Sequence, residues 1–134
     1  MTHLDTSYLV DLLREAARGV KGPATARLES LADEELGVSV HVLCELHAGA
    51  ELSRAPEVER ARVESLSRPL AHSYPDEQFP AEYGRQLAEL RRRGETISTM
   101  DLLIATAALV DGAALVTRNA RDFERVPGLR VLAY

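Results

Sequence analysis

Only one cysteine, Cys44, occurs among the 134 residues, so the chain cannot form an internal disulfide. The fold must therefore rest on a hydrophobic core, and a chain of this length with 46% hydrophobic residues is large enough to form one. The lack of disulfides also fits a reducing compartment. Cys44 is expected to pack in the core as a small hydrophobic residue rather than to act as a nucleophile.

Long apolar runs are missing as well. No stretch reaches the ~18 apolar residues that predict a membrane-spanning helix. The first segment, MTHLDTSYLVDLL, has no basic region, and Asp5 and Asp11 interrupt its apolar run, so it does not match a signal peptide. These absences predict a soluble, cytoplasmic protein that does not associate with membranes.

A net positive charge is also lacking. The net charge of −5 has the wrong sign for binding nucleic acid through bulk electrostatics. Lys21 is the only lysine and is followed by Gly22 rather than Ser or Thr, so no phosphate-binding loop of the P-loop type is present. A phosphorylated receiver domain, which needs a lysine after one of its last strands, is excluded for the same reason. The other basic residues are arginines, which suit phosphate contacts, although genome composition explains this bias at least as well.

Segments of strand length alternate with helical patterns along the whole chain. Strands are predicted at 2–5, 35–40, 69–74, 113–117 and 129–133. Helices are predicted at 6–19, 23–32, 41–53, 56–67, 75–94 with a break near Pro80, and 98–111, with a short helical turn at 119–126. Thr6 or Ser7 is expected to cap the first helix, and Gly19 to end it. This order predicts one α/β domain over residues 1–134, a doubly wound parallel sheet of four to five strands with helices on both faces.

Two acidic residues in the first half of the chain are candidate site residues. Asp5 follows the first predicted strand, where it is also a suitable helix N-cap. Glu45 lies in the helix of residues 41–53 among small and apolar neighbours, and the alternatives for it are an edge position or an ion pair with His41. A zinc site formed by His41, Glu45 and His47 is disfavoured, because the two histidines are six residues apart and face different sides of a helix.

The other two candidates lie near the end of the chain. Asp101 opens the largely apolar helix of residues 98–111, where Ser98 to Asp101 match a capping box. A carboxylate at the start of a buried stripe is costly unless something pairs with it, so a cation is the competing explanation. Asp122 follows the strand of residues 113–117 in the segment TRNARDF. Its alternative role is that of a solvated turn residue, and Asn119 is closer to the strand end.

Parallel-sheet geometry brings these candidates together. Ligands of open parallel sheets bind beyond the carboxyl ends of the strands, so Asp5, Asp101 and the turn of residues 119–122 are expected to meet there, with Glu45 facing them. Several neighbouring carboxylates cannot all stay ionised unless a cation neutralises them. Oxygen ligands favour Mg²⁺ or Mn²⁺, which activate water for in-line attack at phosphorus. We expect Asp122 to be the fourth acidic group, with Asn119 as a weaker neutral ligand.

Three segments resemble the PIN-domain ribonucleases, and among them the VapC-type toxins of bacterial toxin–antitoxin pairs. These segments are LDTSYLVDLL, VSVHVLCELHAGA and ISTMDLLIATAALVDGAALVTRNARDFERVPGLRVL. The resemblance implies a metal-dependent endoribonuclease whose acidic site corresponds to Asp5, Glu45 and Asp101. The fourth position departs from the pattern, since Asn119 stands where many PIN domains have Asp, and Asp122 follows three residues later.

The same resemblance implies partners. PIN-domain toxins usually act on structured RNA such as transfer or ribosomal RNA, are silenced by a small VapB-like antitoxin, and commonly form homodimers. The competing hypothesis is a PIN-like module that binds RNA or protein without holding metal.

Overall fold

The computed structural model describes residues 1–134 and contains one parallel sheet of five strands in the order β3-β2-β1-β4-β5. The strands are β1 (Thr2–Leu4), β2 (Leu36–Ser39), β3 (Ala71–Ser73), β4 (Ala114–Val116) and β5 (Val131–Leu132). In register, His3 of β1 lies opposite Gly37 of β2 and Leu115 of β4. The strand order reverses between β1 and β4, and a switch of this kind opens a crevice at the carboxyl ends of the two strands.

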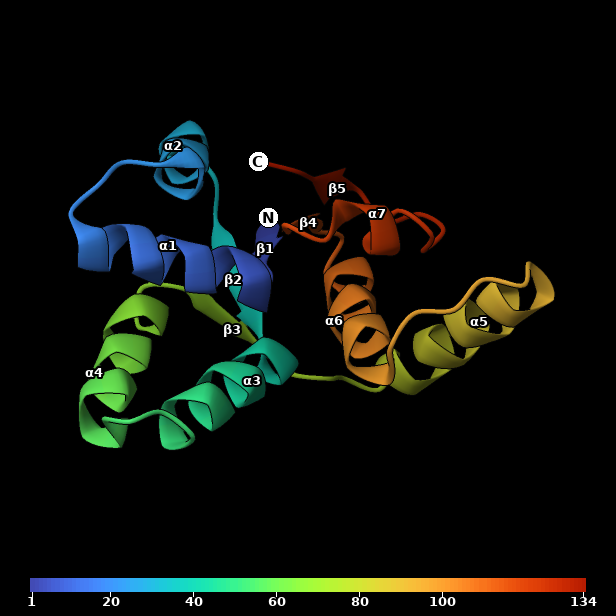
Figure 1. Ribbon diagram of the computed structural model, residues 1–134. Helices are drawn as coiled ribbons and strands as arrows, with labels where there is room; N and C mark the ends of the chain where they lie inside the picture. Colours follow the sequence, from blue (N-terminus) through green and yellow to red (C-terminus); the bar gives the residue numbers. More distant parts are fainter.

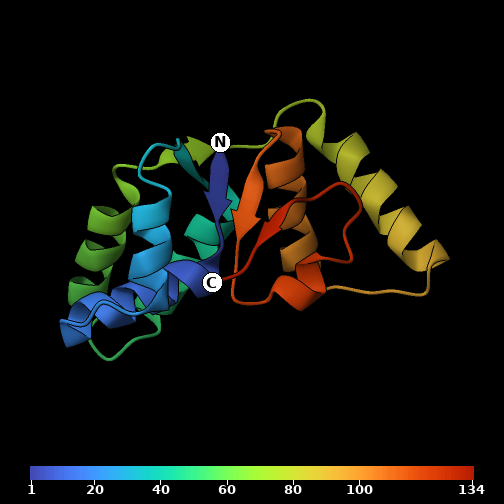
Figure 2. The ribbon, with the colours of Figure 1, turned by 90° about the horizontal axis from the view of Figure 1, so that it is seen from above.

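Seven helices surround the sheet. They are α1 (Thr6–Arg18), α2 (Pro23–Ser30), α3 (Val40–Glu51), α4 (Pro56–Ser67), α5 (Phe79–Arg92), α6 (Thr99–Val110) and α7 (Ala120–Phe123). Helices α1 and α2 lie on one side of the sheet, and α5 and α6 lie on the other (Figure 1). The strand arrows in Figure 2 point toward the front of Figure 1, so Figure 1 faces the carboxyl ends of the strands.

The predicted doubly wound α/β fold is confirmed, and the buried helix is its centre. Six residues of α6 are buried: Leu102, Ile104, Ala105, Thr106, Ala107 and Ala108. Every residue of β1 and β4 is also buried. Burial on both faces of a strand is typical of a parallel sheet covered by helices, which explains why these short strands have no alternation of polar and apolar residues.

Three local predictions were wrong. The helix predicted from residue 75 starts at Phe79, and Pro80 lies in its first turn, where a missing N–H costs nothing. The N-cap of α1 is Asp5, and neither Thr6 nor Ser7 fills that position. Cys44 is exposed, because the buried stripe of α3 passes through other residues: Val42, Leu43, Leu46 and Ala50.

Glu15 anchors the connection between α1 and α2. Its carboxylate accepts hydrogen bonds from the backbone N–H groups of Gly22, Ala24 and Thr25 and from the Thr25 hydroxyl. The contact is close, since a Cβ on Gly22 would lie 2.7 Å from the Glu15 carboxyl carbon. Burial opposes ionisation, but the hydrogen bonds outweigh it and lower the pKa of Glu15 to about 2. The ionised form of Glu15 therefore stabilises the start of α2.

We expect Glu15→Gln to lower the Tm at pH 7, because the amide presents N–H groups where the backbone donors need an acceptor. The pKa of Glu15 falls from 4.5 to about 2 on folding. Its stabilisation is therefore complete above pH 4.5 and is lost as the pH falls toward 2. Thermal unfolding followed by circular dichroism at pH 7 and pH 3 measures the effect. Glu29→Gln on α2, where Glu29 makes only an exposed pair with Lys21, is the matched control and should leave the Tm nearly unchanged. Equal shifts in both variants would contradict the anchoring role.

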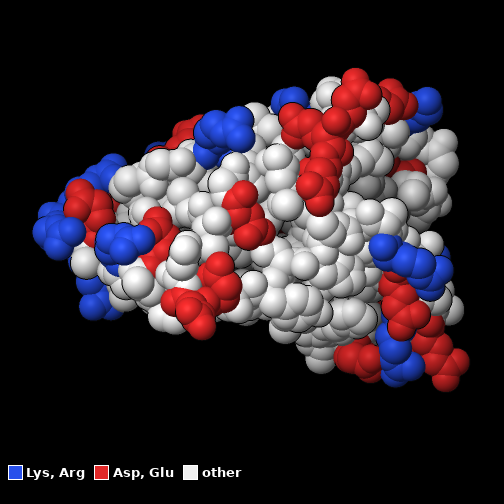
Figure 3. All heavy atoms as spheres, turned by 180° about the vertical axis from the view of Figure 1, so that it is seen from behind, with Lys and Arg blue, Asp and Glu red and all other residues white.

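The face at the amino ends of the strands shows no continuous basic surface. In the view from behind, acidic groups surround a broad uncharged area, and the arginines lie mainly toward the two ends of the molecule (Figure 3). None of the helices is both long and apolar enough to cross a membrane.

Candidate active site

Asp5 lies in the crevice between β1 and β4 and is only 3% exposed. Its Oδ2 accepts hydrogen bonds from the Thr117 hydroxyl at 2.6 Å and from the Ser7 hydroxyl at 3.0 Å. Although Asp5 occupies the N-cap position of α1, its side chain makes no capping hydrogen bond. Asp5 therefore lacks the side-chain hydrogen bond that the alternative role as a helix cap requires. Because both hydrogen bonds use Oδ2, the other carboxylate oxygen has no protein donor and remains available to a ligand.

Glu45 reaches toward the same crevice from α3. Ser39 caps this helix by accepting a hydrogen bond from the backbone N–H of Val42, which starts the helix directly at the end of β2. The Oε1 atom of Glu45 accepts a hydrogen bond from the Thr6 hydroxyl at 2.6 Å. The predicted alternative, an ion pair with His41, does not form, since the His41 ring lies against Phe79 with the ring centroids 5.5 Å apart.

Asp101 lies in the first turn of α6 and is partly buried. The Ser98 hydroxyl accepts a hydrogen bond from the backbone N–H of Asp101 at 3.1 Å, so Ser98 is the cap of α6. Burial raises the pKa of Asp101, and the Asp5 carboxylate raises it further. Glu45 and Asp122 add to this increase, whereas a hydrogen bond with Ser98 opposes it. Asp101 therefore interacts electrostatically with all three of the other predicted acidic residues.

Asn119 and Asp122 follow β4 and are both exposed. Asn119 is the N-cap residue of α7 but makes no side-chain capping hydrogen bond. Asp122 is 3.8 Å from the Arg125 guanidinium, an ion pair within the same segment. Asp122 is thus the only one of the four acidic groups that forms an ion pair with an arginine.

The structure places the four acidic residues around one end of the sheet without closing them into a cluster. No three acidic, histidine or cysteine side chains lie close enough together to hold a metal ion as they are placed. The four residues are nevertheless near enough to interact electrostatically. The pKa of Asp101 is raised by burial and also by the negative charges of the other three. The donor set contains only oxygen atoms, so it fits hard cations such as Mg²⁺ and Mn²⁺ and does not fit zinc.

Ser7 and Thr117 are site residues that the sequence analysis missed in this role. Their hydroxyls lie 3.3 Å apart and both contact Asp5. The Thr117 hydroxyl also accepts a hydrogen bond from the backbone N–H of Asn119. The available signal was a hydroxyl residue shortly after each of two neighbouring strands, Ser7 in the first turn of α1 and Thr117 directly after β4, because the ends of adjacent parallel strands meet.

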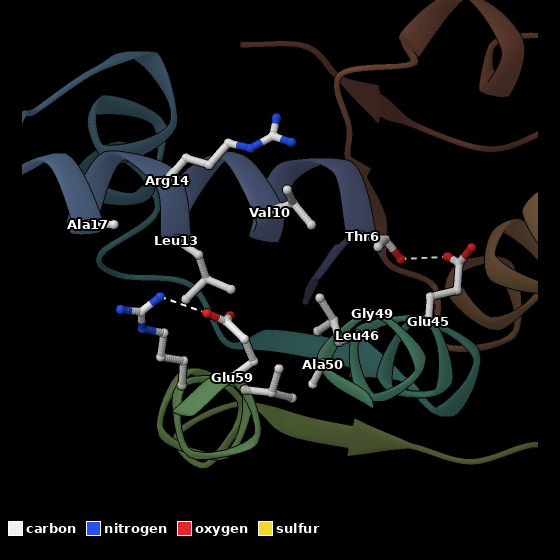
Figure 4. Close-up of a pocket in the computed structure, with 12 residues that line it drawn as sticks. Thr6, Val10, Leu13, Arg14, Ala17, Glu45, Leu46, Gly49, Ala50 and Glu59 are labelled. Atoms are coloured by element: carbon white, nitrogen blue, oxygen red, sulfur yellow. Dashed lines mark hydrogen bonds and ion pairs between the residues drawn. The ribbon is translucent and has the colours of Figure 1, made fainter. Parts of the chain in front are cut away.

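An apolar groove opens beside Glu45. It has a volume of about 310 Å³ and runs between α1, α3 and α4. Its apolar walls include Val10, Leu13, Leu46, Ala50 and Val63. The hydrogen-bonded pair of Thr6 and Glu45 lies at one end of the groove, and the Glu59–Arg62 ion pair lies farther along it (Figure 4). A segment bound in this groove would therefore end next to the acidic residues.

Comparison with known proteins identifies the architecture. The family model described as the PIN domain matches residues 3–129. The chain belongs to the PIN-domain family. This confirms the resemblance found in the three sequence segments.

Several relatives of this PIN domain are VapC proteins. It is 40% identical over 94 residues to the tRNA(fMet)-specific endonuclease VapC of Salmonella typhimurium, covering 70% of this chain and 71% of that protein. It is 30% identical over 127 residues to Ribonuclease VapC1 of Haemophilus influenzae, covering 95% and 92% of the two chains. Among solved structures, DNA-bound VapBC from Salmonella typhimurium has a TM-score of 0.87, 32% identity, and coverage of 99% of this chain and 98% of that one. VapBC2 from Rickettsia felis, bound to a promoter DNA fragment, also has a TM-score of 0.87, with 28% identity and the same coverage.

Proposed function

We propose that this PIN-domain protein is a metal-dependent endoribonuclease that acts as the toxin of a toxin–antitoxin pair. The observation that carries the proposal is the group of acidic residues around Asp5 and Asp101 at the strand-order switch, in a chain related to VapC ribonucleases. The proposed substrate is RNA, and the proposed place of action is the cytoplasm.

The residues proposed to hold Mg²⁺ or Mn²⁺ are Asp5, Glu45, Asp101 and Asp122, with Asn119 beside them. A divalent cation bound there would neutralise the phosphate and promote attack of water at phosphorus. Asp5 is held in place by Thr117 and Ser7 through Oδ2, which leaves its second oxygen to face the cation. The raised pKa of Asp101 supports the proposal, because neighbouring carboxylates that oppose each other's ionisation favour a bound cation. The cation would also offset the negative charge that otherwise repels RNA.

A second candidate is a PIN-like module that binds RNA or protein without metal. The observation in its favour is that the acidic side chains do not converge into a three-ligand cluster. Glu45 and Asp122 have rotatable side chains, and rotation toward a shared cation is the rearrangement that the enzymatic proposal requires. Metal binding in solution separates the two candidates.

We propose that the partner is a small VapB-like antitoxin. Relatives of known structure are VapBC complexes, and the apolar groove of this chain ends at Glu45. A partner segment lying in this groove could insert an arginine among the carboxylates, where charge-assisted hydrogen bonds would hold it and displace the cation. A homodimer remains a prediction of the family resemblance.

Expression of the protein without its partner should arrest bacterial growth. RNA cleavage depletes the translation machinery, so the arrest should be accompanied by cleaved RNA in the cell. Asp5→Asn, expressed to the same level, should allow growth, because it removes the proposed metal ligand while nearly keeping the shape of the side chain. Unimpaired growth at a high level of folded wild-type protein would count against the toxin function.

Asp122→Ala is expected to weaken Mn²⁺ binding, but less than Asp5→Ala does. Asp122 is exposed and already lies near Arg125, so it would contact the cation through water, since Mg²⁺ and similar ions keep part of their hydration shell. Titration calorimetry compares the two variants, with Glu124→Ala as a control for loss of a neighbouring exposed charge. Unchanged affinity in Asp122→Ala together with lost affinity in Asn119→Ala would reverse the assignment.

A further inference from the structure

A polar cluster beside the acidic site has no role in the mechanism so far. It consists of Asp11 on α1, Arg118 in the turn after β4, and Tyr134 beyond β5. The Oδ1 atom of Asp11 accepts a hydrogen bond from Arg118 Nη1 at 2.8 Å. The Oδ2 atom accepts one from the Tyr134 hydroxyl at 2.5 Å. Both oxygens of Asp11 therefore have a donor within the protein, and Arg14 Nη1 also lies 3.6 Å from Oδ1.

The cluster is connected to Asp5 by a short chain of hydrogen bonds. Ser7 and Asp11 are four residues apart on α1 and share one face of the helix. The backbone N–H of Arg118 donates to the Ser7 hydroxyl oxygen at 3.1 Å, and the Ser7 hydroxyl donates to Asp5. Arg118 thus makes two hydrogen bonds to α1: its side chain donates to Asp11 and its backbone N–H donates to Ser7. The residue before it, Thr117, donates directly to Asp5.

Tyr134 closes the cluster from the other side. Its ring packs edge-on against Tyr8, with the ring centroids 4.9 Å apart, and Tyr8 is fully buried. Burial and the hydrogen bond to Asp11 both raise the pKa of Tyr134, so its hydroxyl stays protonated and donates throughout the neutral range. The Tyr134 ring therefore has a rigid support, and its hydroxyl has one strong acceptor.

We propose that Asp11 and Tyr134 are positioning residues for the proposed metal site: Tyr134 holds Asp11 and Asp11 holds Arg118, so that Thr117 and Ser7 orient Asp5. This inference rests on the proposed function. Metal-binding carboxylates need outer hydrogen bonds to hold their orientation, and sites must be held to within about 0.5 Å to work well. The Asp11 side chain is 20% exposed and that of Arg118 is 53% exposed, so their ion pair adds little to stability. We expect the ion pair to affect how precisely the Asp5 carboxylate is positioned.

Tyr134→Phe tests the proposal, because it removes the hydroxyl and keeps the ring on Tyr8. We expect Mn²⁺ affinity measured by calorimetry to fall about fivefold, less than the 10- to 100-fold effect of a residue that contacts the metal ligand directly. The kcat for a labelled RNA should fall while KM and the Tm stay close to wild type. Tyr74→Phe is the matched control, since Tyr74 is 65% exposed, and it should change none of these quantities.

Asp11→Asn provides a second variant with a spectroscopic readout. Loss of the Asp11 charge should lower the pKa of Tyr134 toward its ordinary value of 10.0, which absorbance titration of tyrosine ionisation detects. This variant frees both Arg118 and Tyr134, so its loss of Mn²⁺ affinity should exceed that of Tyr134→Phe.

Three other outcomes would overturn the inference. A wild-type protein that binds Mn²⁺ and cleaves RNA, with Tyr134→Phe unchanged in both, contradicts the positioning role alone. A raised and salt-dependent KM with unchanged kcat and Mn²⁺ affinity in Asp11→Asn would make Arg118 an RNA contact rather than part of a positioning chain. A wild-type protein that neither binds Mn²⁺ nor cleaves RNA contradicts the proposed function and the positioning role with it.

Discussion

Asp5→Asn should abolish RNA cleavage while leaving the fold intact. The side chain is 3% exposed and accepts hydrogen bonds from Thr117 and Ser7. The amide oxygen of asparagine can accept the same two hydrogen bonds, so the crevice keeps its packing. What is lost is the negative charge that would hold the cation. Since even outer partners of a metal ligand change affinity 10- to 100-fold, loss of this ligand should reduce Mn²⁺ affinity and cleavage by more than about 100-fold.

The measurement combines titration calorimetry, cleavage of a labelled RNA and thermal unfolding. Asp33→Asn is the matched control, because Asp33 is exposed in the loop before β2 and loses the same charge far from the acidic residues. This control should cleave RNA like the wild type, which separates local metal binding from the effect of net charge. An Asp5→Asn variant that is folded and cleaves at the wild-type rate would remove Asp5 from the site.

Asp101→Asn should have opposite effects on activity and on stability. Burial and the carboxylate of Asp5 raise the pKa of Asp101 above its ordinary value of 3.8. The folded protein therefore binds a proton at Asp101 more tightly than the unfolded chain does, and the free energy of unfolding decreases as the pH rises from 3.8 through the raised pKa. At pH 7 the ionised carboxylate is destabilising. Asparagine removes this cost, so the Tm of the metal-free protein should rise, while cleavage should fall by about 100-fold or more if Asp101 is a ligand.

Differential scanning fluorimetry with EDTA and with excess Mn²⁺ resolves these effects. Mn²⁺ should raise the Tm of the wild type, because a ligand that binds only the folded state stabilises it, and it should raise the Tm of Asp101→Asn far less. Ser98→Ala is the contrasting variant. It removes the cap of α6 at a cost of about 1 kcal/mol and leaves the acidic charges in place. Full activity and reduced stability in Asp101→Asn would instead show that Asp101 serves to stabilise the start of α6.

The sequence was sufficient to predict the architecture because each element has a local cause. The apolar run after Ser98 predicts a buried helix, and α6 is the most buried helix of the fold. Gly19, at a φ of 66°, ends α1 as predicted, since glycine adopts this left-handed conformation without strain. The resemblance to PIN domains added the acidic residues as a set, and the structure groups them around one end of the sheet.

Contacts between distant segments were beyond the reach of the sequence. The hydrogen bond from Thr117 to Asp5 joins residues 112 positions apart, and no periodicity encodes it. The exposure of Cys44 depends on which face of α3 packs against the neighbouring helices, a choice made by tertiary contacts. The first turn of α5 was placed too early because Pro80 was interpreted as a break, whereas proline is favoured at a helix start.

RNA cleavage by this PIN domain is proposed to depend on a divalent cation held by its acidic residues. The most direct test incubates the purified protein with total cellular RNA in Mn²⁺, in EDTA, and in EDTA followed by excess Mn²⁺, with Asp5→Asn in parallel. We expect defined RNA fragments in Mn²⁺, none in EDTA, recovery of cleavage when Mn²⁺ is restored, and no fragments with Asp5→Asn. Intact RNA under every condition, or cleavage that persists in EDTA, would contradict this proposal.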